Sequence, residues 1–432
     1  MQAKFDAFFK LSQNNTSVRT EVMAGATTFL TMAYIIFVNP SILAAAGMDK
    51  GAVFTATCLA AALGTLIMGL YANYPVALAP GMGLNAYFTY GVVLGMGYSW
   101  QAALGAVFVS GVLFVILSVL PVRQWIINAI PMSQKMAISA GIGLFLAIIA
   151  LENAGIVADH PATLVTLGDL SKPEPLLASL GFVVMVALSA RKVPGAMIIA
   201  MLAVTFLGVA LGVTETRGFF SMPPSLAPTF LQMDIPAALE VSMLSVVLAF
   251  LIVNIFDTAG TLVGVAHRAK MLDAKGRLPR LKQALLADSA ATVAGAALGT
   301  SPTTSYIESA SGVNVGGRTG LTAVTVASLF LLSLFLSPLA ATIPLYATAP
   351  ALLFVACLML QGLAEINWSD LTEAAPAVVT AVAMPLTFSI SSGIGMGFIA
   401  FAAIKLASGR FSDINPAVLM IALAFIYKFA ML

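Results

Sequence analysis

Charged residues are scarce in this chain, and their scarcity excludes an ordinary soluble protein. Asp, Glu, Lys and Arg supply only 9% of its 432 residues, whereas 60% are hydrophobic. A soluble domain carries about a quarter charged residues, most of them on its surface. Because so little of this chain can face water, we expect lipid to surround most of it.

Residues that perform chemistry are equally few. Cys58 and Cys357 both lie inside apolar runs, which is typical of small buried side chains and not of disulfides. His160 and His267 fall in predicted loops far apart in the sequence, so we expect no metal site and no cofactor. The chain contains no Walker motif and suggests no Ser–His–Asp set, so we expect no enzyme. A net charge of +2 gives no reason to expect nucleic acid as a partner.

Long apolar runs are what the chain has in place of charge. A membrane-spanning helix needs about 20 apolar residues. The runs that reach or approach this length are 22–46, 51–72, 82–97, 101–120, 135–157, 175–190, 194–213, 240–266, 283–299, 302–316, 319–338, 346–364, 374–390, 392–408 and 415–431. They predict an all-α polytopic membrane protein with about 14 transmembrane segments. The last run could either cross the membrane or lie on its surface.

Basic residues indicate the orientation. They gather in the N-terminal tail, around residues 123–135, in the Arg191-Lys192 turn and between residues 268 and 282. If the N-terminus is inside, the last three positions follow the fourth, sixth and eighth crossings, all on one side, as the positive-inside rule requires. We therefore predict a multi-pass protein of the plasma (inner) membrane, with a cytoplasmic tail over residues 1–21 and no cleavable signal peptide.

Glycine and proline interrupt one apolar segment in each half of the chain. Residues 79–85 read Ala-Pro-Gly-Met-Gly-Leu-Asn, and residues 299–305 read Gly-Thr-Ser-Pro-Thr-Thr-Ser. Each is the third apolar segment of its half. Unwound backbone at membrane depth is tolerated only where it is buried or lines a cavity. Paired broken helices in corresponding positions therefore point to the binding site of a transporter.

Two carboxylates stand beside the predicted breaks. Asp257 lies in the middle of an apolar run, and Glu308 follows the second break. An acid within a membrane is costly, so its default interpretation is functional. Either acid could instead be structural, paired with a backbone or hydroxyl group. Asp288, close to the basic loop, and Glu152, near the end of its run, fit structural roles better.

The same segments resemble a known family. Residues 26–34 (ATTFLTMAY), the break at 79–85, residues 256–261 (FDTAGT), and residues 306–309 (YIES) followed by 316–320 (GGRTG) resemble the AzgA-like purine permeases. These permeases belong to the nucleobase–ascorbate transporter (nucleobase–cation symporter 2) superfamily. The resemblance covers nearly the whole chain.

The resemblance implies an architecture. It is a seven-plus-seven inverted repeat whose third and tenth segments are broken, divided into a core domain and a gate domain that move as an elevator. In this sequence the core would comprise residues 22–132 and 240–340, and the gate residues 133–214 and 341–432. The resemblance also implies proton coupling and a homodimer held together by the gates.

The resemblance also implies a site. The family's binding acids on the eighth and tenth helices match Asp257 and Glu308, and Glu308 is the first candidate for the proton carrier. Thr261 stands where uracil-type relatives carry a histidine, which argues against pyrimidine transport. The full predicted substrate-binding set is Phe29, Thr31, Asn85, Ala86, Asp257, Thr261, Thr304, Ile307 and Glu308. Tyr87, Phe88 and Tyr306 are, with Phe29, the rings that could stack on a base.

The chemistry of these residues suits a purine. A purine base is flat and neutral, and carboxylates can accept hydrogen bonds from its ring N–H groups. We expect a purine–proton symporter, with hypoxanthine and guanine favoured by the sequence at residues 257–260 and adenine as the alternative. An anion transporter or channel on the same fold is the alternative of a different class. An anion would need a basic residue at the binding site, where this chain has two acids.

Overall fold

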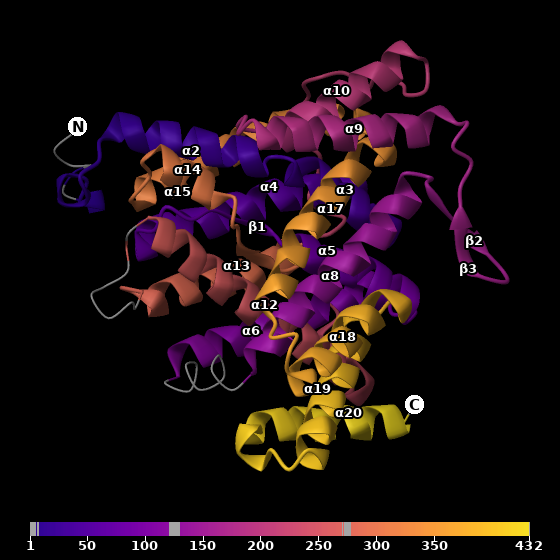
Figure 1. Ribbon diagram of the computed structural model, residues 1–432. Helices are drawn as coiled ribbons and strands as arrows, with labels where there is room; N and C mark the ends of the chain where they lie inside the picture. Colours follow the sequence, from indigo (N-terminus) through magenta and orange to yellow (C-terminus); the bar gives the residue numbers. More distant parts are fainter. Residues whose placement is uncertain (1–5, 7, 121–129, 270, 272–277, 432) are drawn as a thin grey trace.

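Helices make up nearly all of the structure, a computed structural model that describes residues 6, 8–120, 130–269, 271 and 278–431 (Figure 1). In this part of the chain nine helices are long and apolar enough to cross a membrane, and three shorter apolar helices accompany them. The chain is therefore a multi-pass membrane protein, and the all-α class is confirmed. The number of crossings remains a prediction.

The helices follow the predicted apolar runs along both halves of the chain. The first half contains α2 (Val18–Met32), α3 (Ile35–Ala45), α4 (Lys50–Ile67), α5 (Met82–Ala86), α6 (Trp100–Val119), α8 (Met132–Asn153), α9 (Pro173–Ala190) and α10 (Ala196–Ala210). The second half contains α11 (Ile235–Ala238), α12 (Val241–Arg268), α13 (Leu281–Leu298), α14 (Ser309–Val315), α15 (Gly320–Ser333), α16 (Ser337–Thr342), α17 (Leu345–Leu360), α18 (Leu371–Leu386), α19 (Ile390–Ala407) and α20 (Pro416–Met431).

The structure corrects several local predictions. The run 22–46 forms two helices, because the chain turns at Ala33 and Tyr34 between α2 and α3. Where the sequence predicts a loop, β2 (Val157–His160) and β3 (Leu164–Leu167) form an antiparallel hairpin, so His160 lies in a strand.

Two further residues predicted in loops lie in helices. His267 belongs to the last turn of α12. Lys135 belongs to α8, because Pro131 directly precedes that helix and starts it earlier than the apolar run suggests. Residues 121–129 and 272–277, which carry part of the basic pattern used for orientation, lie outside the described residues.

The two predicted breaks meet in the middle of the fold. β1 (Leu78–Pro80) and β4 (Thr303–Ser305) pair antiparallel, with Leu78 opposite Ser305 and Pro80 opposite Thr303. Backbone hydrogen bonds extend the pairing on both sides, from Gly81 N to Pro302 O (2.9 Å) and from Tyr306 N to Ala77 O (2.9 Å). Short half-helices follow each strand: α5, continued by a π-helix over Tyr87–Gly95, and α14. The extended backbone at this depth is thus satisfied by the other break.

Threonine side chains hold the crossing strands against α4 and α13. In α4 the Thr65 hydroxyl accepts from Leu78 N (2.8 Å) and donates to Leu78 O (3.0 Å). In α13 the Thr292 hydroxyl donates to Thr303 O (2.8 Å). Each helix therefore clamps the break of its own half. Two similarly placed clamps are what the predicted inverted repeat would produce.

The helices pack as two groups. In one, α4 and α6 pack on α13, α15 packs on α4, and α2 packs on α15 (Figure 1). In the other, α17, α18 and α19 pack on α8, with α9 and α10 beside α17. These groups correspond to a core and a gate. The residue boundaries given above for the two domains remain predictions.

The glycine-rich segment 316–320 has a structural explanation. Fully buried Glu21, in the first turn of α2, accepts hydrogen bonds from the backbone N–H groups of Arg318 (2.9 Å), Thr319 (3.2 Å) and Thr322 (3.2 Å). It thereby caps the N-terminus of α15, where a carboxylate suits the helix dipole. A Cβ at Gly320 would lie 1.9 Å from Gly69 O, so only glycine fits there.

The C-terminal helix returns along its predecessor. Near the end of α19, Lys405 Nζ lies 3.4 Å from Asp413 Oδ2, just before α20. Near the start of α19, Ser391 Oγ accepts from Lys428 Nζ (3.2 Å), close to the end of α20. α20 therefore runs antiparallel along nearly the whole of α19. For residues 415–431, a membrane crossing and a surface position both remain predictions.

Candidate substrate-binding site

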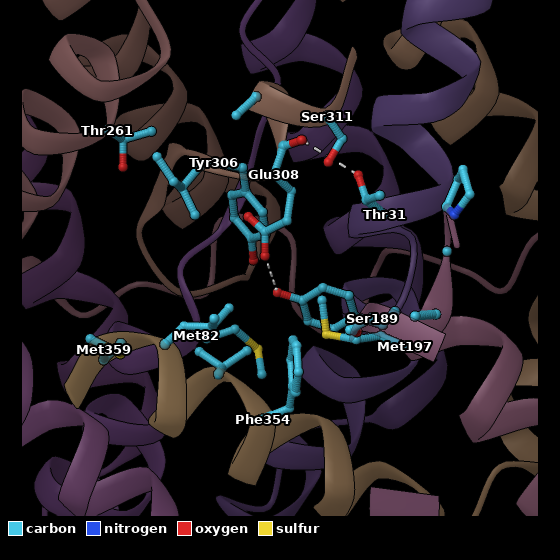
Figure 2. Close-up of a pocket in the computed structure, with 18 of the residues that line it drawn as sticks. Thr31, Met82, Ser189, Met197, Thr261, Tyr306, Glu308, Ser311, Phe354 and Met359 are labelled. Carbon is cyan, nitrogen blue, oxygen red and sulfur yellow. Dashed lines mark hydrogen bonds between the residues drawn. The ribbon is translucent and has the colours of Figure 1, made fainter. Parts of the chain in front are cut away.

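A cavity of about 810 Å³ lies beside the crossing of β1 and β4 (Figure 2). The core side of its wall comes from α2, the first break, α12 and the second break. The opposite side comes from α8, the α9–α10 turn and α17. The cavity therefore lies between the two groups of helices, and its size falls in the range of about 300–1,000 Å³ that is usual for ligand pockets.

Both candidate acids line this cavity. Asp257 lies halfway along α12, and Glu308 directly precedes α14, where the half-helix begins. Asp257 has no hydrogen-bond partner among the residues that the structure describes. Glu308 has one side-chain partner there: the hydroxyl of Tyr34 donates to Glu308 Oε1 (2.8 Å), the bond drawn as a dashed line in Figure 2. One carboxylate is thus free to accept from a ligand, and the other is held by a single neutral donor.

Tyr34 occupies a third interruption of helical backbone. It stands at the turn between α2 and α3, is buried, and lines the cavity opposite Glu308. One helical turn earlier, the Thr31 hydroxyl lies 3.5 Å from the backbone carbonyl of Glu308. The turn between α2 and α3 therefore places the Tyr34 hydroxyl where it can reach the carboxylate that precedes α14.

Six of the nine predicted binding residues line the cavity together. They are Thr31, Asp257, Thr261, Thr304, Ile307 and Glu308. The remaining three do not line it. Phe29 packs edge-on against Phe330, with ring centroids 5.3 Å apart. Asn85 and Ala86 are fully buried in the first half-helix.

Of the four candidate stacking rings, the cavity wall includes only that of Tyr306. Its hydroxyl donates to the carbonyl of Pro80, which fixes the ring beside the crossing strands. Tyr87 and Phe88 are fully buried elsewhere, and Tyr87 packs against Phe250.

Asn85 belongs to a buried network behind the cavity. Its amide donates to Asn39 Oδ1 (3.0 Å), and the Asn39 amide in turn donates to Thr57 (2.8 Å) and Thr300 (2.8 Å). These four side chains come from both halves of the chain. Asn85 therefore helps to fix the position of the crossing strands and does not contact the cavity.

Asp288 forms the matching support on the other side. Although the sequence places it near the basic loop, its side chain is fully buried in α13. One oxygen accepts from the Thr258 hydroxyl (2.7 Å), and the other accepts from Ser305 N (2.8 Å) and the Ser305 hydroxyl (2.7 Å). With three donors satisfied, this acid fits the structural role that its position suggested, as a clamp that ties β4 to α12 and α13.

Sequence reasoning missed Tyr34 and Asn39 as contributors to the site. Tyr34 is the last residue of the segment 26–34, which carries the family resemblance. The motif therefore marked Tyr34, but it did not indicate that its partner is an acid 274 positions away. Asn39 precedes Pro40 within α3, and a polar residue beside a proline inside an apolar run is a usable signal. The partners of both residues depend on the crossing of the two halves.

Comparisons with known proteins agree with this geometry. The model of the Permease family matches residues 19–396. Adenine permease AdeP of Escherichia coli is 48% identical over 427 residues, which cover 99% of this chain and 96% of AdeP. Guanine/hypoxanthine permease PbuO of Bacillus subtilis is 46% identical over 425 residues, which cover 96% of this chain and 98% of PbuO.

Solved structures extend the comparison to the fold. The transmembrane domain of a cyanobacterial bicarbonate transporter, BicA, matches with a TM-score of 0.65 at 17% identity, over 89% of this chain and 97% of that chain. At such low identity the likeness concerns the fold alone. The core and gate arrangement is therefore shared, whereas the contents of the cavity are specific to each protein.

Proposed function

This chain belongs to the Permease family, the nucleobase–ascorbate transporters, and from that premise we propose that it imports purine bases together with protons. It is a transporter and not an enzyme. The observation that carries the proposal is the convergence of Asp257 and Glu308 in one cavity beside two paired half-helix breaks. The relatives named as adenine and guanine/hypoxanthine permeases support a purine as the substrate.

The cavity offers a purine complementary groups. Asp257, which has no partner in the described structure, accepts a ring N–H. Glu308 exchanges its bond from Tyr34 for one from the base, so binding leaves no buried acceptor unpaired. The ring of Tyr306 and the apolar side chains of Ile307 and Met82 cover the faces of the base. The polar edge of the base and its apolar faces are thus recognised by different side chains of the cavity.

Proton coupling follows from the charge of the substrate. A neutral base cannot be concentrated by the membrane potential, whereas a co-transported proton contributes about 2.3 kcal/mol per 100 mV. A carboxyl in a desolvated cavity is a suitable carrier, because desolvation disfavours its charged form. We assign this role first to Glu308, whose bond from Tyr34 can break and reform, and second to Asp257.

The packing supports an elevator motion. The acids and both breaks belong to the core group, and the opposite cavity wall comes from the gate group. Movement of the core against the gate would carry the intact site across the membrane. We further propose a homodimer formed through the gates, and a plasma membrane location with the N-terminus in the cytoplasm.

The preferred base is a finer question. We favour hypoxanthine and guanine, on the sequence at residues 257–260, and keep adenine as the second candidate because AdeP is as similar to this chain as PbuO is. An anion substrate fits less well, since the acids lie beside the breaks, where an anion would need a cation.

Transport into proteoliposomes tests the proposal. Labelled hypoxanthine and labelled adenine are offered under an imposed pH gradient, with and without a protonophore, and a panel of unlabelled bases competes. We expect accumulation that the protonophore abolishes and that purines, but not uracil, inhibit. Accumulation that follows a sodium gradient and ignores the protonophore would contradict proton coupling, and competition by uracil alone would contradict purine transport.

A further inference from the structure

The cavity follows only part of the long helices that form its wall. On α12 its lining residues begin at Asp257, and none of them comes from residues 241–256. On α8 the described lining residue is Ser139, in the first half of that helix, and on α17 the lining residues begin at Phe354, in its second half. The cavity therefore extends from Asp257 toward the end of α12 and not toward its start.

Beyond the cavity, near the start of α12, core and gate contact one another. Ser245 precedes Asp257 by twelve residues, about 18 Å along the axis of α12. Its backbone carbonyl accepts a hydrogen bond from the hydroxyl of Ser391 in α19 (3.5 Å). In the same way, Asn153 at the end of α8 donates to the hydroxyl of Tyr90 in the first half-helix (3.5 Å). We call this side the closed end. Both bonds are long, so each is weak by itself.

A cation of the C-terminal helix supports the contact made by Ser391. Lys428 is the one charged residue of α20, which packs against α19 (Figure 1). Its Nζ donates to Ser391 Oγ (3.2 Å), which in turn donates to the carbonyl of Ser245. A hydroxyl that accepts from a cation is a better donor, so the charge strengthens the bond from gate to core.

The surroundings of Lys428 favour this role over an ordinary surface position. A lysine near the end of an apolar helix usually extends its amine toward water or lipid headgroups. Here Nζ is turned to Ser391, which is fully buried, and the rings of Phe425 and Phe429 flank it, each with its centroid 5.9 Å away. No acidic side chain pairs with Lys428 in the part of the chain that the structure describes. Its polar contact is thus made toward the boundary between core and gate.

The closed end also contains a group that favours opening. The side-chain hydroxyl of Ser245 is buried and has no hydrogen-bond partner among the described residues. A buried hydroxyl without a partner disfavours the arrangement that buries it, because opening would return it to water. The bonds through Ser391 therefore oppose a group beside them that is better satisfied when the end is open.

We propose that Lys428 and Ser391 form a latch that holds the closed end shut, so that the C-terminal helix takes part in the transport cycle. The inference rests on the proposed function, because it needs the core to move against the gate. Movement of α12 relative to α19 separates Ser245 from Ser391 and opens this end. Weakening the latch therefore raises the fraction of molecules that are open there and leaves the residues of the cavity unchanged.

The simplest alternative is that Lys428 only anchors α20. Replacing an anchor would leave the closed end unaffected. Tyr427 supplies the matched control, because it adjoins Lys428 in α20 and its side chain is exposed. A latch makes the two residues differ, whereas a general loosening of α20 would make them alike.

The rate at which a bulky, hydrophilic thiol reagent labels Ser245→Cys measures opening of the closed end. The purified full-length protein also carries Cys58→Ala and Cys357→Ala. Ser245→Cys keeps the latch, because Ser391 bonds to the backbone carbonyl at this position. We expect Lys428→Met and Ser391→Ala each to speed labelling by about 3- to 10-fold. The double variant should label no faster than Ser391→Ala alone, because both changes interrupt one chain of bonds. Binding of a labelled purine should be unchanged in all of them.

A cross-link distinguishes failure of this inference from failure of the proposed function. Tyr90→Cys/Asn153→Cys, joined by a bifunctional thiol reagent, should still bind a labelled purine but lose uptake, and cleavage of the reagent should restore uptake. Gln134→Cys/Thr380→Cys joins α8 to α18 within the gate and should transport whether cross-linked or not. Uptake that survives the first cross-link would contradict the movement of core against gate, and with it the proposed mechanism.

If the cross-link blocks uptake, the labelling rates decide the fate of the latch. An unchanged rate in Lys428→Met assigns this residue to anchoring and overturns the proposal. Additive effects of Lys428→Met and Ser391→Ala would show that the two residues act separately. Equal acceleration in Tyr427→Phe would point to loosening of α20. Absence of labelling in every variant would mean that the closed end does not open, which also overturns the latch.

Discussion

The Asp288 clamp allows a graded test of what holds the second break in place. Its carboxylate satisfies Ser305 N, the Ser305 hydroxyl and the Thr258 hydroxyl, all buried. In Asp288→Asn the amide oxygen can keep both Ser305 bonds. The new NH₂ then faces the Thr258 hydroxyl, which can accept it and turn its own hydrogen to Thr304, 3.0 Å away. Only the charge assistance is lost, at a cost of about 1–2 kcal/mol.

Asp288→Ala removes the acceptors altogether. Ser305 N–H then stays unpaired in the protein interior together with two hydroxyls, and breaking such a buried network costs about 3–5 kcal/mol. Chemical unfolding of the purified variants in detergent measures both effects, with Asp159→Ala, an exposed acid of β2, as the control. Equal unfolding free energies for the Asn and Ala variants would refute the clamp. A fully stable Asp288→Asn variant without transport would place Asp288 in the proton path instead.

Three further changes test other contacts. Tyr34→Phe removes the one side-chain donor to Glu308 in the described structure. Equilibrium binding should show a change in base affinity of about 3- to 100-fold, with no loss of folded protein. Unchanged affinity would exclude Tyr34 from the site. Glu21→Ala uncaps α15 and leaves three backbone N–H groups unpaired, so it should lower the unfolding free energy by about 2–4 kcal/mol. Glu21→Gln should lower it by less. Equal losses in the two variants would contradict the capping role. Hydrogen bonds from Thr372 and Arg410 lower the pKa of Asp370 to about 2. Its contribution to stability is therefore complete above the ordinary pKa of an aspartate and is lost as the pH falls from there through 2. Asp370→Asn should therefore leave the pH profile of uptake between pH 5 and 8 unchanged, and a shifted profile would refute this.

The sequence predicted the features that depend on local composition. Glycine and proline at 79–85 and 299–305 marked the breaks, because these residues disfavour a continuous helix when they are clustered. Asp257 and Glu308 stood out because acids are rare inside apolar runs. Those signals were sufficient to place the cavity beside the breaks.

The contacts between segments far apart in the sequence were not predictable in this way. Asp288 follows a basic loop, so its position suggested a surface, yet α13 turns it inward onto Ser305. Asn85 lies within the break motif, yet its side chain points to Asn39 behind the cavity. In both residues the direction of the side chain is set by a helix from another part of the chain. Periodicity within one segment carries no information about that partner.

Binding of a labelled purine to Asp257 and Glu308 variants tests the central claim most directly. Each acid is expected to form a charge-assisted hydrogen bond worth about 1.5–3 kcal/mol, so Asp257→Asn and Glu308→Gln should each weaken binding by about 10- to 150-fold. Glu152→Gln, an exposed acid near the end of α8 that does not line the cavity, is the matched control and should bind as the wild type does. Wild-type affinity in both Asp257→Asn and Glu308→Gln, in protein that is folded, would contradict the account.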